Sequence, residues 1–85
     1  MKCYLVMAMR KSGFTDAVIA PHRDFLAELR AQGKLAMTGG FADGSGGAYV
    51  LQNVASLAEA QALVARDPLL RQDASALTVY EWNTH

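Results

Sequence analysis

The apolar run from Cys3 to Met9 is the feature that most restricts how this sequence can fold. The run is much shorter than a membrane-spanning helix, and the polar residues 10–13 end it. A short continuous apolar run of this kind is typical of a β-strand that is buried on both faces. A chain of 85 residues buries only about 60% of the surface of its unfolded state. We therefore expect a partner subunit to help to bury this strand.

Residues 21–32 have the pattern of an amphipathic helix. Phe25, Leu26 and Leu29 recur at helical spacing, charged residues lie opposite, and Gly33 follows as a cap. A start before residue 21 would place Pro21 inside the helix and bend it, so we expect a loop or short turn over residues 14–20. Two strands follow at residues 34–39 and 47–53, joined by a glycine-rich segment.

A second helix is predicted from Ser56 to about Arg66. Ser56 and Glu59 form a variant of the capping box, and Asp67-Pro68 ends the helix because a residue before proline disfavours helical backbone. Residues 67–72 then form a turn or a short extra helix before a last strand at residues 75–82. The order β-α-β-β-α-β predicts a single-domain ferredoxin-like α+β sandwich over residues 1–85, with an antiparallel four-stranded sheet and both helices on one face.

Two helices cover only one face of such a sheet, yet the first and the last strand of the chain carry apolar side chains on both of their faces. In residues 3–9 apolar side chains alternate to both faces, and in the last strand Leu77 and Val79 oppose Tyr80 and Trp82. We therefore expect a homodimer built by packing sheet against sheet, with a buried area of about 1,600 Å² or more.

The balance of charge argues against nucleic acid as a partner. The 8 basic and 8 acidic residues cancel, and no basic cluster exceeds Arg10-Lys11, so nucleic acid is not an expected partner.

No signal-like segment with a cleavage site is visible, and we expect no membrane association. The single Cys3 excludes an intramolecular disulfide and fits a reducing compartment. A cytoplasmic protein is expected.

His22 and Asp67 are the candidate catalytic residues. His22 shares a helix face with Phe25 and Leu29, while Asp67 continues an apolar stripe on the second helix. The expected topology brings the start of the first helix and the end of the second to the same end of the domain. A carboxylate fixes the imidazole tautomer and stabilises its protonated form, whereas a helix N-terminus opposes that charge. Together they predict an acid/base pair in a pocket; a structural histidine and a helix-ending aspartate are the alternatives.

The pocket is expected between the helix ends and the sheet, closed by the segment from Gly39 to Gly47. Candidate substrate contacts are Phe25, Gly39, Gly40, Phe41 and Ser45, with Phe14 as a further lining residue. The glycine-rich segment lacks the lysine of a phosphate-binding loop and is otherwise read as an ordinary hairpin loop. His85 stands last in the sequence, so no metal site is expected with His22. No flavin, nicotinamide or haem motif is visible, and no cofactor is expected.

Order and spacing of several short motifs identify a family resemblance over nearly the whole chain. The sequence resembles the YCII family of YciI-like proteins in Pro21-His22, Leu26, Leu29, Gly33-Lys34-Leu35, Gly39-Gly40, an aliphatic strand, Ala60 and Asp67-Pro68. The resemblance implies a dimeric α/β barrel of ferredoxin-like protomers and a catalytic His-Asp pair at His22 and Asp67. It also associates the family with dehydrochlorination of a halogenated hydroxyaromatic, although the loop after the second strand is shorter here.

Two functions follow as hypotheses. The first is a cofactor-free enzyme that uses the His22-Asp67 pair for elimination, dehydrochlorination or isomerisation of a small organic acid or phenol. The second is a non-catalytic, dimeric metabolite-binding or accessory module in which the same pair anchors a ligand or braces the fold.

Overall fold

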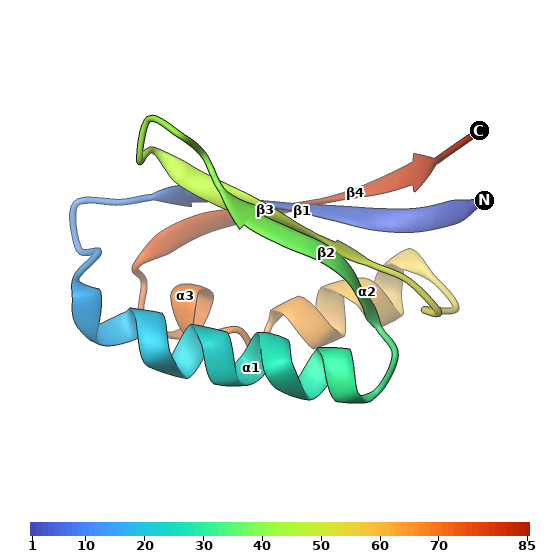
Figure 1. Ribbon diagram of the computed structural model, residues 1–85, viewed down its shortest axis with the longest axis horizontal. Coiled ribbons are helices and arrows are strands. Elements are labelled where there is room, and N and C mark those ends of the chain that lie inside the picture. The colour runs from blue at the N-terminus through green and yellow to red at the C-terminus, as the bar shows by residue number, and fades with distance from the viewer.

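The computed structural model describes residues 1–85 as a four-stranded antiparallel sheet with order β2-β3-β1-β4 and helices against one face (Figure 1). The α+β fold and the β-α-β-β-α-β order are confirmed. Most predicted boundaries shift by only one or two residues. The elements are β1 (Lys2–Arg10), a 3-10 turn (Asp16–Val18), α1 (Ile19–Ala31), β2 (Leu35–Gly40), β3 (Gly46–Leu51), α2 (Leu57–Val64), α3 (Pro68–Arg71) and β4 (Ser75–Asn83).

The main core lies between the sheet and the helices. Tyr4 and Val6 of β1 face the helices, and they pack with Phe25 and Leu29 of α1 and Val64 of α2. Antiparallel pairing of β1 with both β3 and β4 places it at the centre of the sheet. The central position explains why the most apolar run of the sequence forms this strand, since its backbone is hydrogen-bonded on both sides.

The start of α1 differs from the prediction. A loop or short turn is expected over residues 14–20, and Asp16–Val18 do form a 3-10 turn, but α1 begins directly after it at Ile19, two residues before the predicted start. Pro21 therefore lies in the first helical turn. The backbone N–H groups of that turn have no acceptor within the helix, so the missing N–H of proline costs no hydrogen bond there. Val18, just before the helix, is buried and anchors the start of α1.

The other face of the sheet has no helix over it (Figure 1). Large apolar side chains are exposed on this open face: Met37 is 64% exposed, Tyr80 53% and Trp82 45%. A hollow of about 370 Å³ on this face is lined by Met37 and Trp82, together with Leu5 and Phe41. No helix of the structure has the length and hydropathy needed to cross a membrane.

Candidate active site

Asp67 is held at the junction of α2 and α3 by its own capping role. Its backbone is extended, with φ −65° and ψ 126°, and its Oδ1 accepts a hydrogen bond from the backbone N–H of Leu69 at 2.9 Å. Pro68 follows as the first residue of α3, a position that proline favours. The Asp-Pro step that was expected to end the second helix thus also begins a short third one. The cap turns the carboxylate inward, where Asp67 is completely buried.

Two further side chains complete the surroundings of this carboxylate. The Nδ1 atom of His22 lies 2.9 Å from Oδ1 of Asp67, and the hydroxyl of Tyr49 donates to Oδ2 at 2.9 Å. These contacts join α1, β3 and the α2–α3 junction, which are distant in the sequence. The predicted proximity of His22 and Asp67 is confirmed. A buried carboxylate needs such donors, because burial without them carries a large desolvation penalty.

This arrangement selects the tautomer of His22. An ionised carboxylate only accepts hydrogen bonds, so the Nδ1 atom of His22 must carry the proton that it shares with Asp67. In the neutral ring, Nε2 is then the unprotonated nitrogen. The His22 side chain is 18% exposed, whereas its partner Asp67 is 0% exposed. His22 therefore presents a basic nitrogen that has no protein partner, on a ring whose other nitrogen is fixed.

Tyr49 is the third member of this cluster and remains a hydrogen-bond donor. Burial, and then the charge and the hydrogen bond of Asp67, raise the pKa of the Tyr49 phenol well above its ordinary value. Its ring lies beside that of His22, with ring centroids 6.0 Å apart, and meets Phe25 edge-on at 6.4 Å. These contacts hold the phenol in place behind the imidazole.

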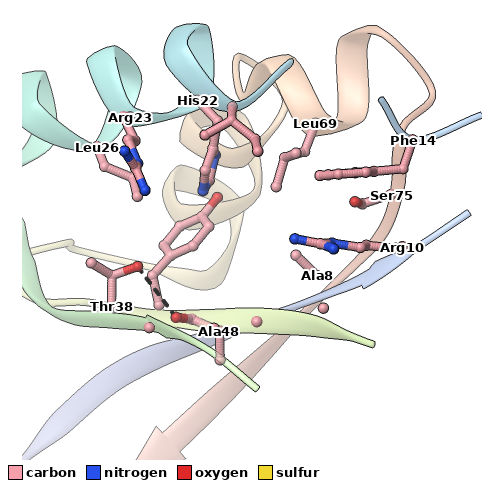
Figure 2. A pocket seen from close by; sticks show the side chains of 16 residues that line it. Ala8, Arg10, Phe14, His22, Arg23, Leu26, Thr38, Ala48, Leu69 and Ser75 are labelled. Carbon is pink, nitrogen blue, oxygen red and sulfur yellow. Dashed lines mark hydrogen bonds between the residues drawn. The ribbon is translucent and has the colours of Figure 1, made fainter. Parts of the chain in front are cut away.

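A cavity of about 360 Å³ adjoins His22 (Figure 2). Its wall on the helix side includes Phe14, Leu26 and Leu69, and the ends of β2 and β3 contribute glycines in place of larger side chains. A Cβ atom at Gly46 would lie 2.1 Å from the carbonyl oxygen of Ala8, so only glycine fits there. The volume is sufficient for a molecule with a single ring. No three His, Cys, Asp or Glu side chains gather in a way that would hold a metal ion.

The expected substrate contacts are only partly brought to this cavity. Gly39 and Gly40 line it, as Phe14 does, whereas Phe25, Phe41 and Ser45 do not. The Phe25 side chain packs in the main hydrophobic core and is only 8% exposed. Phe41 lines the hollow of the open sheet face, on the other side of the sheet. Ser45 belongs to the turn after Phe41, where its backbone N–H bonds to Asp43 Oδ1 at 2.9 Å.

Several residues of this site were not predicted from the sequence. The sequence pattern places Tyr49 in a strand without a site role and does not indicate a pocket role for Arg10, Arg23, Thr38 or Ser75, yet all five line the cavity. The available signal was alternation in residues 47–53, which places Tyr49 and Leu51 on one face. Which face of β3 meets the helices depends on how β3 pairs with β1, where Val6 lies opposite Tyr49. The sequence of a single strand does not show this pairing.

The fold and the site define a class: a ferredoxin-like α+β domain with a buried aspartate that orients a histidine beside a small cavity. Residues 2–83 match the model of the YCII-related domain, and the chain belongs to this family. It is 42% identical over 82 residues to the uncharacterized protein YjpA of Bacillus subtilis (strain 168), covering 96% of this chain and 95% of that protein.

A solved structure resembles the whole fold. It is 5-chloro-2-hydroxyhydroquinone dehydrochlorinase (TftG) from Burkholderia phenoliruptrix AC1100, in complex with 2,5-dihydroxybenzoquinone. The TM-score is 0.73 at 20% sequence identity, and the match covers 98% of this chain and 95% of that chain. A likeness at this level of identity shows that the two proteins share the fold.

Proposed function

We propose that this protein is a cofactor-free enzyme that moves a proton on a small organic acid or phenol, with His22 as the general acid/base. The observation that carries the proposal is the buried Asp67 carboxylate 2.9 Å from Nδ1 of a histidine that lines a cavity. Asp67 orients the ring and stabilises its protonated form, as carboxylate partners of catalytic histidines do. Tyr49 holds the second carboxylate oxygen and so limits how Asp67 can turn.

The proposed chemistry uses Nε2 of His22. In an elimination, this nitrogen takes a proton from the substrate, the freed electron pair forms a new double bond, and a leaving group such as chloride departs with its bonding pair. The protonated imidazole then releases its proton to water. In an isomerisation, the same nitrogen returns the proton to a different atom of the substrate. The elimination needs proton transfer and a leaving group on the substrate, and the isomerisation needs proton transfer alone, for which a His-Asp pair is sufficient.

The comparisons support elimination as the reaction to examine first. The solved structure with the same fold is that of a dehydrochlorinase that acts on a chlorinated hydroxyhydroquinone. A cavity of about 360 Å³ suits a single-ring substrate of that size. The relative with 42% identity has no assigned reaction, so the substrate is proposed here only as a class.

The test compares three variants of the full chain. His22→Gln removes the base, Asp67→Asn keeps the shape of the side chain but removes its charge, and His85→Gln is the control at a histidine outside the cavity. Turnover is measured as chloride release from 5-chloro-2-hydroxyhydroquinone and as solvent-deuterium incorporation into small ring acids and phenols. We expect His22→Gln to lower turnover by at least about 100-fold, Asp67→Asn to lower it by a similar factor, and His85→Gln to leave it unchanged.

Two outcomes would contradict the enzyme. One is turnover that survives in His22→Gln, and the other is an absence of turnover across the whole panel in the unmodified protein. Asp67→Ala is not a useful variant, because it would leave the buried donors of Tyr49 and Leu69 without an acceptor and destabilise the fold. The circular dichroism of each variant controls for folding.

The second candidate function is a non-catalytic metabolite-binding or accessory module. The observation that favours it is the structural use of Asp67, whose carboxylate caps α3 and bonds to buried Tyr49. Under this alternative, the unmodified protein binds ring acids without converting them. Ligand binding with no turnover and no deuterium incorporation would therefore favour the module over the enzyme.

The proposed assembly is a homodimer that buries the open sheet face. Exposed Met37, Tyr80 and Trp82 give this face the apolar character of an interface core. A second copy with the same face would cover the hollow beside Trp82 and bury an area of the standard size, about 1,600 Å². The free thiol of Cys3 on β1 is compatible with the cytoplasmic location proposed for this dimer.

A further inference from the structure

The cavity beside His22 has an excess of positive charge. Arg10 and Arg23 line it, and its lining contains no Asp or Glu side chain. Neither guanidinium has a carboxylate within salt-bridge distance, although the chain carries as many acidic as basic residues. The basic residues that do form such pairs lie elsewhere: Lys2, Lys11, Lys34 and Arg66. The two unpaired arginines therefore favour an anionic ligand in the cavity.

Arg10 is the arginine of the cavity that has a stacking partner. It is near the end of β1, and its guanidinium carbon lies 4.1 Å from the centroid of the Phe14 ring. Figure 2 shows the guanidinium extending beneath Phe14 into the cavity, which His22 enters from α1. Stacking against an aromatic ring orients the guanidinium and leaves its N–H groups free at the edge. Those N–H groups form a fork that matches the two oxygens of a carboxylate.

Ser75 adds a second polar group at the same place. It pairs with Arg10 across the β1–β4 ladder and is only 2% exposed, yet it lines the cavity. Its side-chain oxygen points into the cavity between Phe14 and Arg10 (Figure 2). None of the side-chain hydrogen bonds of the structure involves this hydroxyl, so it remains available to a ligand in the cavity. A ligand oxygen bound to Arg10 would supply a hydrogen-bond partner.

We infer that Arg10, stacked on Phe14 and flanked by the Ser75 hydroxyl, is the carboxylate-binding subsite of this cavity. The ligand is accordingly a single-ring carboxylic acid, bound as its anion, with the carboxylate at Arg10 and the ring directed toward His22. The inference rests on the proposed function of the same cavity and narrows its substrate class from acids and phenols to ring carboxylates. Arg23 adds positive charge at the cavity but has no stacking partner to orient it.

The experiment measures the binding of benzoate and of its neutral counterpart benzamide by isothermal titration calorimetry. Arg10→Gln, Arg10→Lys and Ser75→Ala are compared with Arg30→Gln, which removes the same charge from an exposed site at the end of α1. We expect Arg10→Gln to weaken benzoate binding by at least about tenfold and Ser75→Ala by a smaller factor. Arg10→Lys should restore part of the affinity, and Arg30→Gln should bind as the unmodified protein does. Benzamide should bind more weakly than benzoate, with no dependence on Arg10.

Three results would overturn the subsite. They are no saturable binding of benzoate at millimolar concentration, equal affinity for benzamide and benzoate, and benzoate binding that Arg10→Gln leaves intact. His22→Gln separates this inference from the proposed function. If benzoate binding depends on Arg10 and persists in His22→Gln while no ring carboxylate is converted, the subsite stands and the acid/base role fails. If conversion depends on His22 but benzoate binding does not depend on Arg10, the acid/base role stands and the subsite fails.

Discussion

Asp67 links the fold and the proposed chemistry through a single side chain. Its Oδ1 accepts from the Leu69 N–H and receives the Nδ1 contact of His22, and its Oδ2 accepts from Tyr49. The same contacts that cap α3 therefore select the tautomer of the imidazole. A buried carboxylate that retains all of these donors cannot rotate without losing a hydrogen bond, so the orientation of His22 is a consequence of stable folding.

The pH dependence of stability tests the role of Tyr49 in this cluster. Because burial and Asp67 raise the pKa of its phenol, the unfolded chain ionises near its ordinary value of about 10 while the folded chain stays neutral. The stability that neutral Tyr49 contributes is thus fully present below about pH 10 and is lost as the pH rises toward the folded-state pKa. We expect Tyr49→Phe to remove up to about 1.4 kcal/mol per pH unit from the alkaline slope of the free energy of unfolding.

Urea denaturation across the alkaline range measures this slope. Tyr80→Phe is the matched control, compared in the Trp82→Glu background in which the proposed dimer does not form, since Tyr80 then lies exposed on the open sheet face and makes no hydrogen bond to Asp67. An alkaline slope that is the same in the Tyr49→Phe variant and in the unmodified protein would show that Tyr49 titrates alike in both states.

Local sequence patterns are sufficient to predict the helices and strands. Residues of the site can be predicted only where the order of these elements also shows which of their ends meet. Periodicity and caps predicted the strands and helices, and the crossing order then placed the start of α1 near the end of α2, which is why His22 and Asp67 were found together. The sequence predicts the start of α1 two residues too late, because proline favours the first position of a helix. In the structure Pro21 occupies the first turn, where the missing N–H has no consequence.

The other cavity residues depend on which strands pair, and in which register. Arg10 and Ser75 become neighbours only because β1 pairs with β4, and Tyr49 faces Asp67 only because β3 presents this side chain to the helices. Alternation within one strand identifies two faces but does not say which is inside. The hairpin turn after Gly40 likewise takes Phe41 to the open face, which its aromatic character alone does not indicate.

At the scale of the whole molecule, the open sheet face is the largest feature without a function in the monomer. The proposed dimer covers it, and a charge placed on this face should prevent association. We expect the unmodified protein to have the mass of two chains and Trp82→Glu to have the mass of one. Sedimentation equilibrium measures this mass. Gln61→Glu, which adds the same charge on the exposed side of α2, should remain dimeric.

A monomeric unmodified protein at micromolar concentration would contradict the sheet-to-sheet dimer. A Trp82→Glu variant that still forms dimers would place the interface elsewhere. Neither result would affect the cavity, because His22 and its partners all come from one chain.

The central claim is that Asp67 holds His22 with Nδ1 protonated and Nε2 free at the cavity. Long-range proton–nitrogen NMR of the histidine rings measures this directly, since it reports which ring nitrogen carries the proton in the neutral form. We predict a single Nδ1–H tautomer for His22, whereas His85, which has no hydrogen bond to fix it, should show both tautomers. An Nε2–H tautomer at His22, or a mixture like that of His85, would show that Asp67 does not orient the imidazole in this way.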